Sequence, residues 1–214
     1  MDIHFVERLE RNLEEDLPGS EAQFIMAPME RAKNLEIPDD HILACVLILI
    51  YPKNKDWYVS LIERNINQND THSGQLSFPG GRFNEKDYSY QDCALREAEE
   101  EIGVPASTVG VIGELSSLYV PISNHLIYPF VGFIADFDDF KIQKSEVSEL
   151  LEVPIKHFLD QKNKKKGDIP ARDTVLKEVP YYDIDGRKLW GATAMIMSEF
   201  EHIIRRSLHA DSSR

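Results

Sequence analysis

The 214-residue sequence has only two cysteines, Cys45 and Cys93, and they do not form a Cys-x-x-Cys pair. A disulfide framework and a zinc ribbon are therefore excluded, and both residues are expected to be buried thiols. Long hydrophobic runs are also missing. The longest run, residues 42–51, is about half as long as the roughly 20 residues that a membrane-spanning helix needs. It predicts a core strand, and no membrane partner is expected.

Basic residues are scarce relative to acidic ones. The chain has 24 Lys and Arg against 37 Asp and Glu, which gives a net charge of −13. The resulting field opposes binding to nucleic acids and to anionic membranes. A small phosphorylated ligand remains compatible with this charge, provided that local cations or a bound metal reverse the field at the site. We therefore expect no nucleic-acid partner.

Targeting signals and the common catalytic motifs are absent as well. The N-terminal segment has neither the basic start nor the apolar core of a secretion signal, and the last residues do not form a peroxisomal tripeptide. The expected location is the cytoplasm. There is no Gly-x-Ser-x-Gly elbow, Walker loop, His-Glu-x-x-His or Gly-x-Gly-x-x-Gly, so the enzyme classes built on those motifs are disfavoured.

At this length, 42% hydrophobic residues suffice for a core without disulfides. The mixture of strand and helix patterns, without internal repeats or a low-complexity linker, predicts a single α/β domain. Apolar residues recur every four positions in residues 5–17, which predicts an amphipathic helix that ends at Pro18. This helix is expected to cap the domain or to contact a second copy in a homodimer. We expect residues 1–40 to form this helix and a connector, and residues 41–214 to form the main domain.

The apolar periodicity and the turn residues predict the order of the remaining elements. Strands are expected at residues 42–51, 57–63, 76–78, 108–120 and 126–135. An Asp-Gly pair predicts a hairpin between residues 175–182 and 187–190. Helices are expected at residues 89–102, 145–151, 155–159 and 193–208, and the basic run at residues 161–167 is expected to be a solvated loop.

Three acidic residues of the helix at 89–102 carry the strongest chemical signal. On a helical wheel Glu97, Glu100 and Glu101 share one face, and the apolar residues face elsewhere, which aims the acidic side out of the core. The like charges cost roughly 0.2–0.5 kcal/mol per pair, and the negative end of the helix dipole is unfavourable for them. One reading is a solvated acidic surface. The other is a cation site, and Mg²⁺ prefers such oxygen ligands.

The residues around this helix favour the cation site. The string Arg-Glu-Ala-Glu-Glu-Glu-Ile-Gly-Val at residues 96–104 follows a Phe-Pro-Gly-Gly loop at residues 78–81. On these residues the sequence resembles the Nudix hydrolases, which cleave nucleoside diphosphates linked to another group. The resemblance implies the Nudix fold, an α/β fold with a mixed β-sheet sandwiched between helices, here with an N-terminal helical extension. It also implies Mg²⁺ or Mn²⁺ as the cofactor.

The resemblance assigns roles to individual residues. It implies that the metal ligands are Glu97, Glu100, Glu101 and Gly80. The catalytic residues would be Glu97, Glu100, Arg96 and Glu146, with Arg96 orienting the carboxylates and Glu97 or Glu146 serving as the base. Asp87 is expected to pair with Arg96. The substrate-binding candidates are Arg64, His72, Gly81 and Arg82.

Within the family, the sequence looks like the coenzyme A diphosphatase branch. The supporting motifs are Phe-Pro-Gly-Gly, Ala-Leu-Arg-Glu, the PISNHLIYPF stretch at residues 121–130 and Trp-Gly-Ala-Thr at residues 190–193. The branch's upstream Leu-Leu-Thr, Ser and Arg are replaced here by residues 61–63, Ile66 and Asp70. The alternative substrates are NADH, ADP-ribose or another nucleoside diphosphate derivative. A non-catalytic binding module is a further alternative, which the three intact Glu residues disfavour.

Overall fold

The computed structural model describes residues 2, 4–28, 36–65, 74–136, 139–171 and 174–209. Within these residues, eight strands form one mixed sheet with the central order β3-β2-β1-β7-β5. The strands are β1 (Ile42–Lys53), β2 (Asp56–Arg64), β3 (Leu76–Ser77), β4 (Gly80–Arg82), β5 (Gly110–Glu114), β6 (Leu118–Val120), β7 (His125–Phe133) and β8 (Val147–Pro154). β1 and β7 run parallel, and the other pairs are antiparallel.

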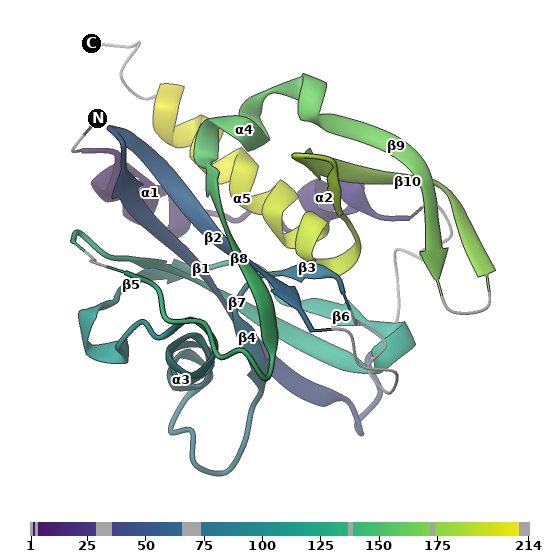
Figure 1. Cartoon of the computed structure of the whole chain (residues 1–214), viewed down its shortest axis with the longest axis horizontal. Helices are drawn as coiled ribbons and strands as arrows, with labels where there is room; N and C mark the ends of the chain where they lie inside the picture. Colours follow the sequence, from purple (N-terminus) through teal and green to yellow (C-terminus); the bar gives the residue numbers. More distant parts are fainter. Residues whose placement is uncertain are drawn as a thin grey trace.

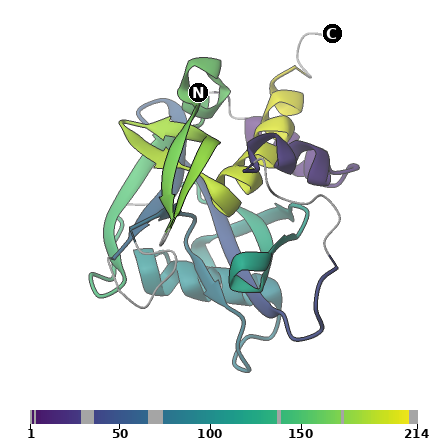
Figure 2. The ribbon, with the colours of Figure 1, turned by 90° about the vertical axis from the view of Figure 1, so that its right-hand side faces the viewer.

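Helices cover both faces of this sheet, as Figures 1 and 2 show. Helix α3 (Tyr90–Ile102) lies on one face, and helices α1 (Phe5–Leu13) and α5 (Gly191–His209) lie on the other. Each face has its own buried apolar cluster. β1 and β2 contribute side chains to both clusters, because successive residues of a strand point to opposite faces. The predicted α/β sandwich is confirmed.

A second, three-stranded sheet packs beside the first and is joined to α5. It consists of β9 (Lys164–Ala171), β10 (Thr174–Ile184) and β11 (Arg187–Leu189) in the order β11-β10-β9. The buried carboxylate of Glu201 accepts hydrogen bonds from Tyr182 on β10 and from Arg205, and it forms an ion pair with Lys164 on β9. The predicted hairpin is confirmed, with Asp185 and Gly186 both at positive φ in its turn.

The N-terminal region is more regular than its sequence suggests. The first helix ends at Leu13 rather than at Pro18, and the expected connector contains α2 (Gly19–Gln23) and the 3₁₀ turn Phe24–Met26. The buried Glu199 on α5 explains the fold-back, because its carboxylate accepts hydrogen bonds from the Gly19 N–H (3.0 Å) and from Gln23 Nε2 (2.8 Å). Helix α1 thus caps its own domain by packing on α5 and β5.

Three local predictions were wrong. Residues 145–151, expected as a helix, enter β8, which pairs with β2. The basic run at residues 161–167 enters β9, because Lys164 and Lys165 are neutralised there by Glu201 and Asp183. The single strand expected at residues 108–120 is divided into β5 and β6, after a 3₁₀ turn at Ala106–Thr108. The remaining short elements are α4 (Ile155–Leu159) and the 3₁₀ turns Pro121–Ser123 and Gln161–Asn163.

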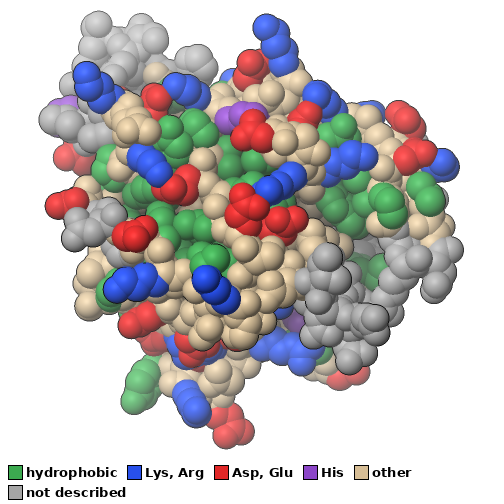
Figure 3. All heavy atoms as spheres, in the orientation of Figure 1, with side chains coloured by type: hydrophobic (Ala, Val, Ile, Leu, Met, Phe, Trp, Pro, Cys, Tyr) green, Lys and Arg blue, Asp and Glu red, His purple; other side chains and the backbone are tan. Residues whose placement is uncertain are grey.

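The surface, the helices and the two cysteines have the following features in the described residues. On the face shown in Figure 3, acidic and basic side chains are interspersed. No helix in the described ranges combines the length and apolarity that crossing a membrane requires. Cys45 and Cys93 are both buried free thiols, as predicted.

Candidate active site

Two consecutive glycines bring the backbone of β4 against β1 on one side and against α3 on the other. Gly81 pairs with Cys45, and Gly80 pairs with Val46. A Cβ atom at Gly80 would lie 2.3 Å from the Cys45 carbonyl oxygen, and a Cβ atom at Gly81 would lie 2.3 Å from Glu97 Oε2. The fold therefore requires glycine at Gly80, where the close atoms belong to the backbone, whereas a Cβ atom at Gly81 would displace the Glu97 carboxylate. The Gly81 backbone packs directly against the Glu97 carboxylate.

Helix α3 has well-defined ends that fix its register. Ser89 is the N-cap, and its hydroxyl accepts a hydrogen bond from the Asp92 N–H at 3.1 Å. Gly103 adopts the left-handed conformation (φ 71°) at the C-terminal end, where its N–H donates to the Glu99 carbonyl. The predicted helix and its termination at Gly103 are confirmed. Glu97 and Glu101 are one turn apart and face the glycine loop.

Arg96 is the cation at the centre of the acidic helix. Its Nε and Nη2 donate to the two oxygens of Asp87 at 2.7 and 3.0 Å, which is a bidentate ion pair. Its Nη1 donates to Glu97 Oε1 at 2.7 Å and to Glu100 Oε2 at 3.1 Å. The predicted pairing of Asp87 with Arg96 is confirmed, and the guanidinium holds two of the three glutamates in place.

The Asp87–Arg96 pair is electrostatically stable. The Asp87 side chain is only 2% exposed, and its hydrogen bonds from Arg96 lower its pKa below the usual range. The Asp87 contact in turn raises the pKa of Arg96. Because both groups stay charged, Arg96 presents a fixed positive charge to Glu97 and Glu100.

The three glutamates occupy different environments. The side chain of Glu100 is 58% exposed and that of Glu97 is 15% exposed, whereas Glu101 is 2% exposed. The expectation that the whole acidic side points out of the core is therefore wrong for Glu101. The glycine loop and Arg64 cover Glu101, since the Gly80 N–H donates to Glu101 Oε2 at 2.8 Å and Arg64 Nη1 lies 3.5 Å from Oε1.

Burial changes the protonation of two of these carboxyls. Desolvation raises the pKa of Glu101 to about 7, despite the opposing effects of the Gly80 N–H and Arg64. Desolvation also raises the pKa of Glu97, against the hydrogen bond from Arg96. The nearby Glu146 charge raises both values further. A carboxyl with a raised pKa near neutrality can accept and release a proton at physiological pH.

The raised pKa of Glu101 predicts a pH-dependent cost to stability in the metal-free protein. Below pH 4.5 both the folded and the unfolded state hold the proton, so the cost is absent. Between pH 4.5 and about 7 the unfolded state releases the proton first, so stability falls as pH rises, by about 3 kcal/mol in total. Glu101→Gln lacks this titration, so its stability relative to the wild type should rise by about that amount.

This prediction is checked by urea unfolding in EDTA at pH 5, 6, 7 and 8. Glu99→Gln is the matched control, because it removes one carboxylate from the same helix at an exposed position. Parallel pH profiles for wild type and Glu101→Gln would show that Glu101 titrates normally.

The other predicted site residues lie at different distances from this centre. Arg64 reaches it through Glu101. Glu146 lies in an exposed turn close enough to influence Glu97 and Glu101 electrostatically. The Arg82 side chain is exposed, and its carbonyl accepts a hydrogen bond from Arg96 Nη2 at 3.3 Å. His72 lies outside the described residues, as do Ile66 and Asp70.

Sequence reasoning missed the residues that hold the end of α3. The Gln143 N–H donates to the Glu101 carbonyl and the Lys141 N–H donates to the Ile102 carbonyl, both at 2.9 Å. The segment around these residues satisfies helix carbonyls that would otherwise have no intrahelical partner. No pattern in the sequence signals these contacts, because they use backbone groups of residues about 40 positions from the helix.

The donor chemistry of the site fits a hard divalent cation, because the carboxylates of α3 supply only oxygen. Within the described residues, no three His, Cys, Asp or Glu side chains converge closely enough to hold a metal ion. Arg96 lies between Glu97 and Glu100, and Glu101 turns towards Gly80. Glu97 and Glu101 thus lie against the glycine loop, Arg96 joins Glu97 to Glu100, and Arg64 is the cationic partner of Glu101.

Comparisons with known proteins agree on one family. The family model described as the NUDIX domain matches residues 40–174. An uncharacterized Nudix hydrolase, NudL of Yersinia enterocolitica, is 36% identical over 137 residues, which cover 64% of this chain and 69% of that protein. A NudL of Yersinia pestis is 34% identical over the same length.

Solved structures share the fold. A MutT/nudix family protein from Enterococcus faecalis has a TM-score of 0.50 at 15% identity, covering 90% of this chain and 71% of its own. A MutT protein from Methanosarcina mazei Go1 also has a TM-score of 0.50, at 18% identity, covering 85% of this chain and 100% of its own. In both cases the share of this chain that is covered is larger than the share that the family model matches at residues 40–174.

Proposed function

This chain belongs to the Nudix hydrolase family, and from that membership we propose that it cleaves the diphosphate of coenzyme A or acyl-coenzyme A with Mg²⁺ or Mn²⁺. The products are adenosine 3′,5′-bisphosphate and a 4′-phosphopantetheine. Nudix hydrolases generally use divalent metal ions, and the acidic helix of this chain supplies oxygen ligands of the kind that such ions prefer.

One observation carries the proposal. Glu97 lies against the Gly81 backbone, Glu101 lies against the Gly80 N–H and Glu100 is joined to Glu97 through Arg96, although acids near the end of a helix are unfavourable for the fold. The Gly80 N–H and Arg64 do not offset the burial of Glu101, whose pKa is raised to about 7. Binding of a divalent cation to carboxylates explains it, because the cation removes their mutual repulsion.

Different residues of the chain would bind the metal, accept the proton and orient the carboxylates. Glu97, Glu100, Glu101 and the Gly80 carbonyl would hold the metal, which would neutralise charge on the diphosphate oxygens. Water attacks one phosphorus and the bridging P–O bond breaks, so a base must take the proton from the water. Glu97 is one candidate, because burial raises its pKa, and Glu146 is the other. Arg96, fixed by Asp87, orients Glu97 and Glu100.

The choice of coenzyme A rests on the motifs that resemble the coenzyme A diphosphatase branch. Arg64, Gly81, Arg82 and His72 are the proposed substrate contacts, and a guanidinium is suited to a phosphate. Asp70 stands where that branch has an Arg. This difference makes NADH or ADP-ribose the alternative substrates for the same chemistry, and a binding module without turnover is the alternative from another class.

The substrate assignment is tested with equal concentrations of coenzyme A, NADH and ADP-ribose in Mg²⁺ or Mn²⁺, with products resolved by chromatography. Fastest release of adenosine 3′,5′-bisphosphate supports the proposal. Faster release of AMP from NADH or ADP-ribose would make that compound the assigned substrate, and the reaction would still be diphosphate hydrolysis. Absence of turnover with all three would favour the binding module. A Glu100→Gln sample is the control for contaminating phosphatases, because it should lack the activity.

A further inference from the structure

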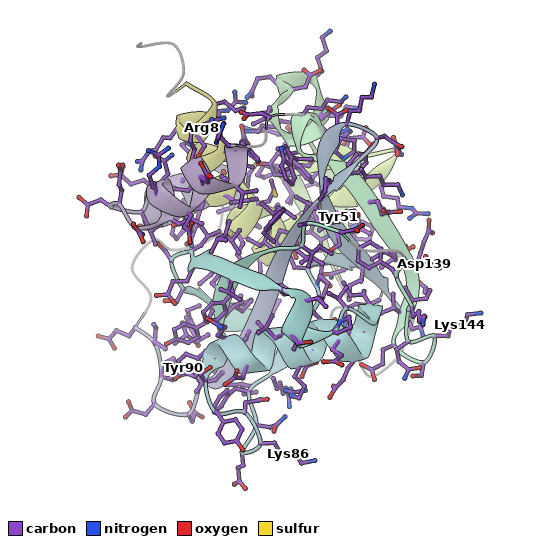
Figure 4. All side chains as sticks on the ribbon, turned by 90° about the vertical axis from the view of Figure 1, so that its left-hand side faces the viewer. Arg8, Tyr51, Lys86, Tyr90, Asp139 and Lys144 are labelled. Carbon is purple, nitrogen blue, oxygen red and sulfur yellow. The ribbon has the colours of Figure 1, made fainter. Side chains whose placement is uncertain are left out.

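The turn that carries Glu146 is held from two sides by hydrogen bonds to its backbone. On one side the Gln143 N–H donates to the Glu101 carbonyl at 2.9 Å, which joins the turn to the last turn of α3. Within the turn, the N–H groups of Glu146 and Val147 both donate to the Gln143 carbonyl at 2.9 Å. Figure 4 shows the labelled Lys144 beyond the end of α3 opposite to Tyr90.

On the other side the turn is held by a single residue at the end of β2. The Asn65 N–H donates to the Glu146 carbonyl at 2.8 Å, and Asn65 Nδ2 donates to the Lys144 carbonyl at 2.8 Å. Asn65 therefore makes two hydrogen bonds to the same three-residue stretch. The turn is exposed, but two of its carbonyl groups accept hydrogen bonds from the half-buried Asn65. These hydrogen bonds restrict the backbone motion of the turn.

An irregularity in the sheet makes this contact possible. In the pairing of β2 with β8, Glu63 lies opposite Glu149 and Arg64 lies opposite Val147, so Ser148 is the extra residue of a bulge. The Ser148 hydroxyl donates to the Glu63 carbonyl at 3.0 Å. Bulges bend a strand and re-aim neighbouring side chains. Here the bulge bends the start of β8 so that the Glu146 carbonyl lies within hydrogen-bonding distance of the Asn65 N–H.

The geometry points to Asn65 as a positioning residue, which holds the Lys144–Glu146 turn so that the Glu146 carboxylate faces Glu97 and Glu101 during the reaction. This inference rests on the proposed function, because it requires Glu146 to take part in hydrolysis. Asn65 contacts no reacting atom in this account and acts only through the turn. The hydrogen bond from the Gln143 N–H to the Glu101 carbonyl, at 2.9 Å, keeps this turn beside the end of α3 that carries Glu97 and Glu101.

The test is a double-mutant cycle on kcat with coenzyme A, NADH or ADP-ribose, whichever the wild type hydrolyses fastest. Asn65→Ala and the isosteric Asn65→Asp both remove the donor to the Lys144 carbonyl, and each should lower kcat about 5- to 10-fold with little change in KM. In a Glu146→Gln background, Asn65→Ala should lower kcat by less than about 2-fold, because the positioned group is already lost.

The matched control is Asn163→Ala. Asn163 Nδ2 also donates to a main-chain carbonyl at 2.8 Å, that of His157, but Asn163 lies in another part of the fold. This variant should keep the wild-type kcat. As a readout independent of turnover, hydrogen exchange at the Glu146 and Val147 amides should be faster in Asn65→Ala than in Asn163→Ala.

Each other outcome overturns the inference in a distinguishable way. An unchanged kcat in Asn65→Ala, an undiminished effect of Asn65→Ala in the Glu146→Gln background, or a wild-type kcat in Glu146→Gln would each overturn the positioning role alone. A wild-type protein that hydrolyses none of the three substrates would overturn the proposed function, and the positioning role with it.

Discussion

Gly80→Ala is expected to destabilise the folded protein by about 3–5 kcal/mol, enough to leave much of it unfolded. The new Cβ atom would lie 2.3 Å from the Cys45 carbonyl oxygen and 2.7 Å from Val46 Cα. These atoms belong to the backbone of the central strand β1, so they cannot move aside as a side chain can. The backbone at Gly80 also has a φ of 158°, which L-residues rarely adopt.

Urea unfolding of Gly80→Ala beside two other glycine variants measures this effect. Gly110→Ala is the control for the loss of a strand glycine, because its Cβ would meet only the Phe133 carbonyl oxygen, at 3.8 Å. Gly81→Ala should stay folded and lose activity, because its Cβ meets the movable Glu97 carboxylate. Equal stabilities for Gly80→Ala and Gly110→Ala would show that the glycine loop is not packed as described.

Glu97→Gln is expected to lower kcat about 10²- to 10⁴-fold without unfolding the protein. The substitution keeps the shape of the side chain, so contacts with Gly81 survive. It removes the negative charge that Arg96 Nη1 contacts at 2.7 Å, and with it a proposed metal ligand and a candidate base. Steady-state kinetics at saturating Mg²⁺, with thermal melts of the same samples, measure the two effects separately.

Glu99→Gln is the matched control for this prediction. It is the same substitution within the same acidic run, but the exposed Glu99 carboxylate turns away from the site and accepts a hydrogen bond from the Ala106 N–H at 3.2 Å. Its kcat should stay within about 2-fold of the wild type. If Glu99→Gln and Glu97→Gln lose activity equally, the loss reflects the total charge of the helix rather than the site.

Elements with local signals could be predicted from the sequence. Helix α3 was predicted because Ser89 and Gly103 mark its ends, and the β10–β11 hairpin was predicted from Asp185 and Gly186. The Asp87–Arg96 pair was predicted from the resemblance to the Nudix signature, and its two residues lie in one loop and helix. In each case the interaction depends on residues close together in the chain.

The errors arose where distant residues decide the outcome. A helical wheel gives the direction of Glu101 around the axis, but it does not show that Gly80 and Arg64 cover that direction. Residues 145–151 have a pattern too short to distinguish a helix from a strand, and pairing with β2 decides for a strand. Lys164 joins a strand because Glu201, 37 positions later, neutralises it.

The central claim is that the acidic face of α3 and the glycine loop form a divalent-cation-dependent centre for diphosphate hydrolysis. Its most direct test is turnover of coenzyme A, NADH and ADP-ribose by the wild-type protein in Mn²⁺, after removal of the metal with excess EDTA, and after Mn²⁺ is restored. The account predicts turnover of at least one substrate, its loss in EDTA and its recovery with Mn²⁺. Undiminished turnover in EDTA, or none in Mn²⁺, would contradict the account.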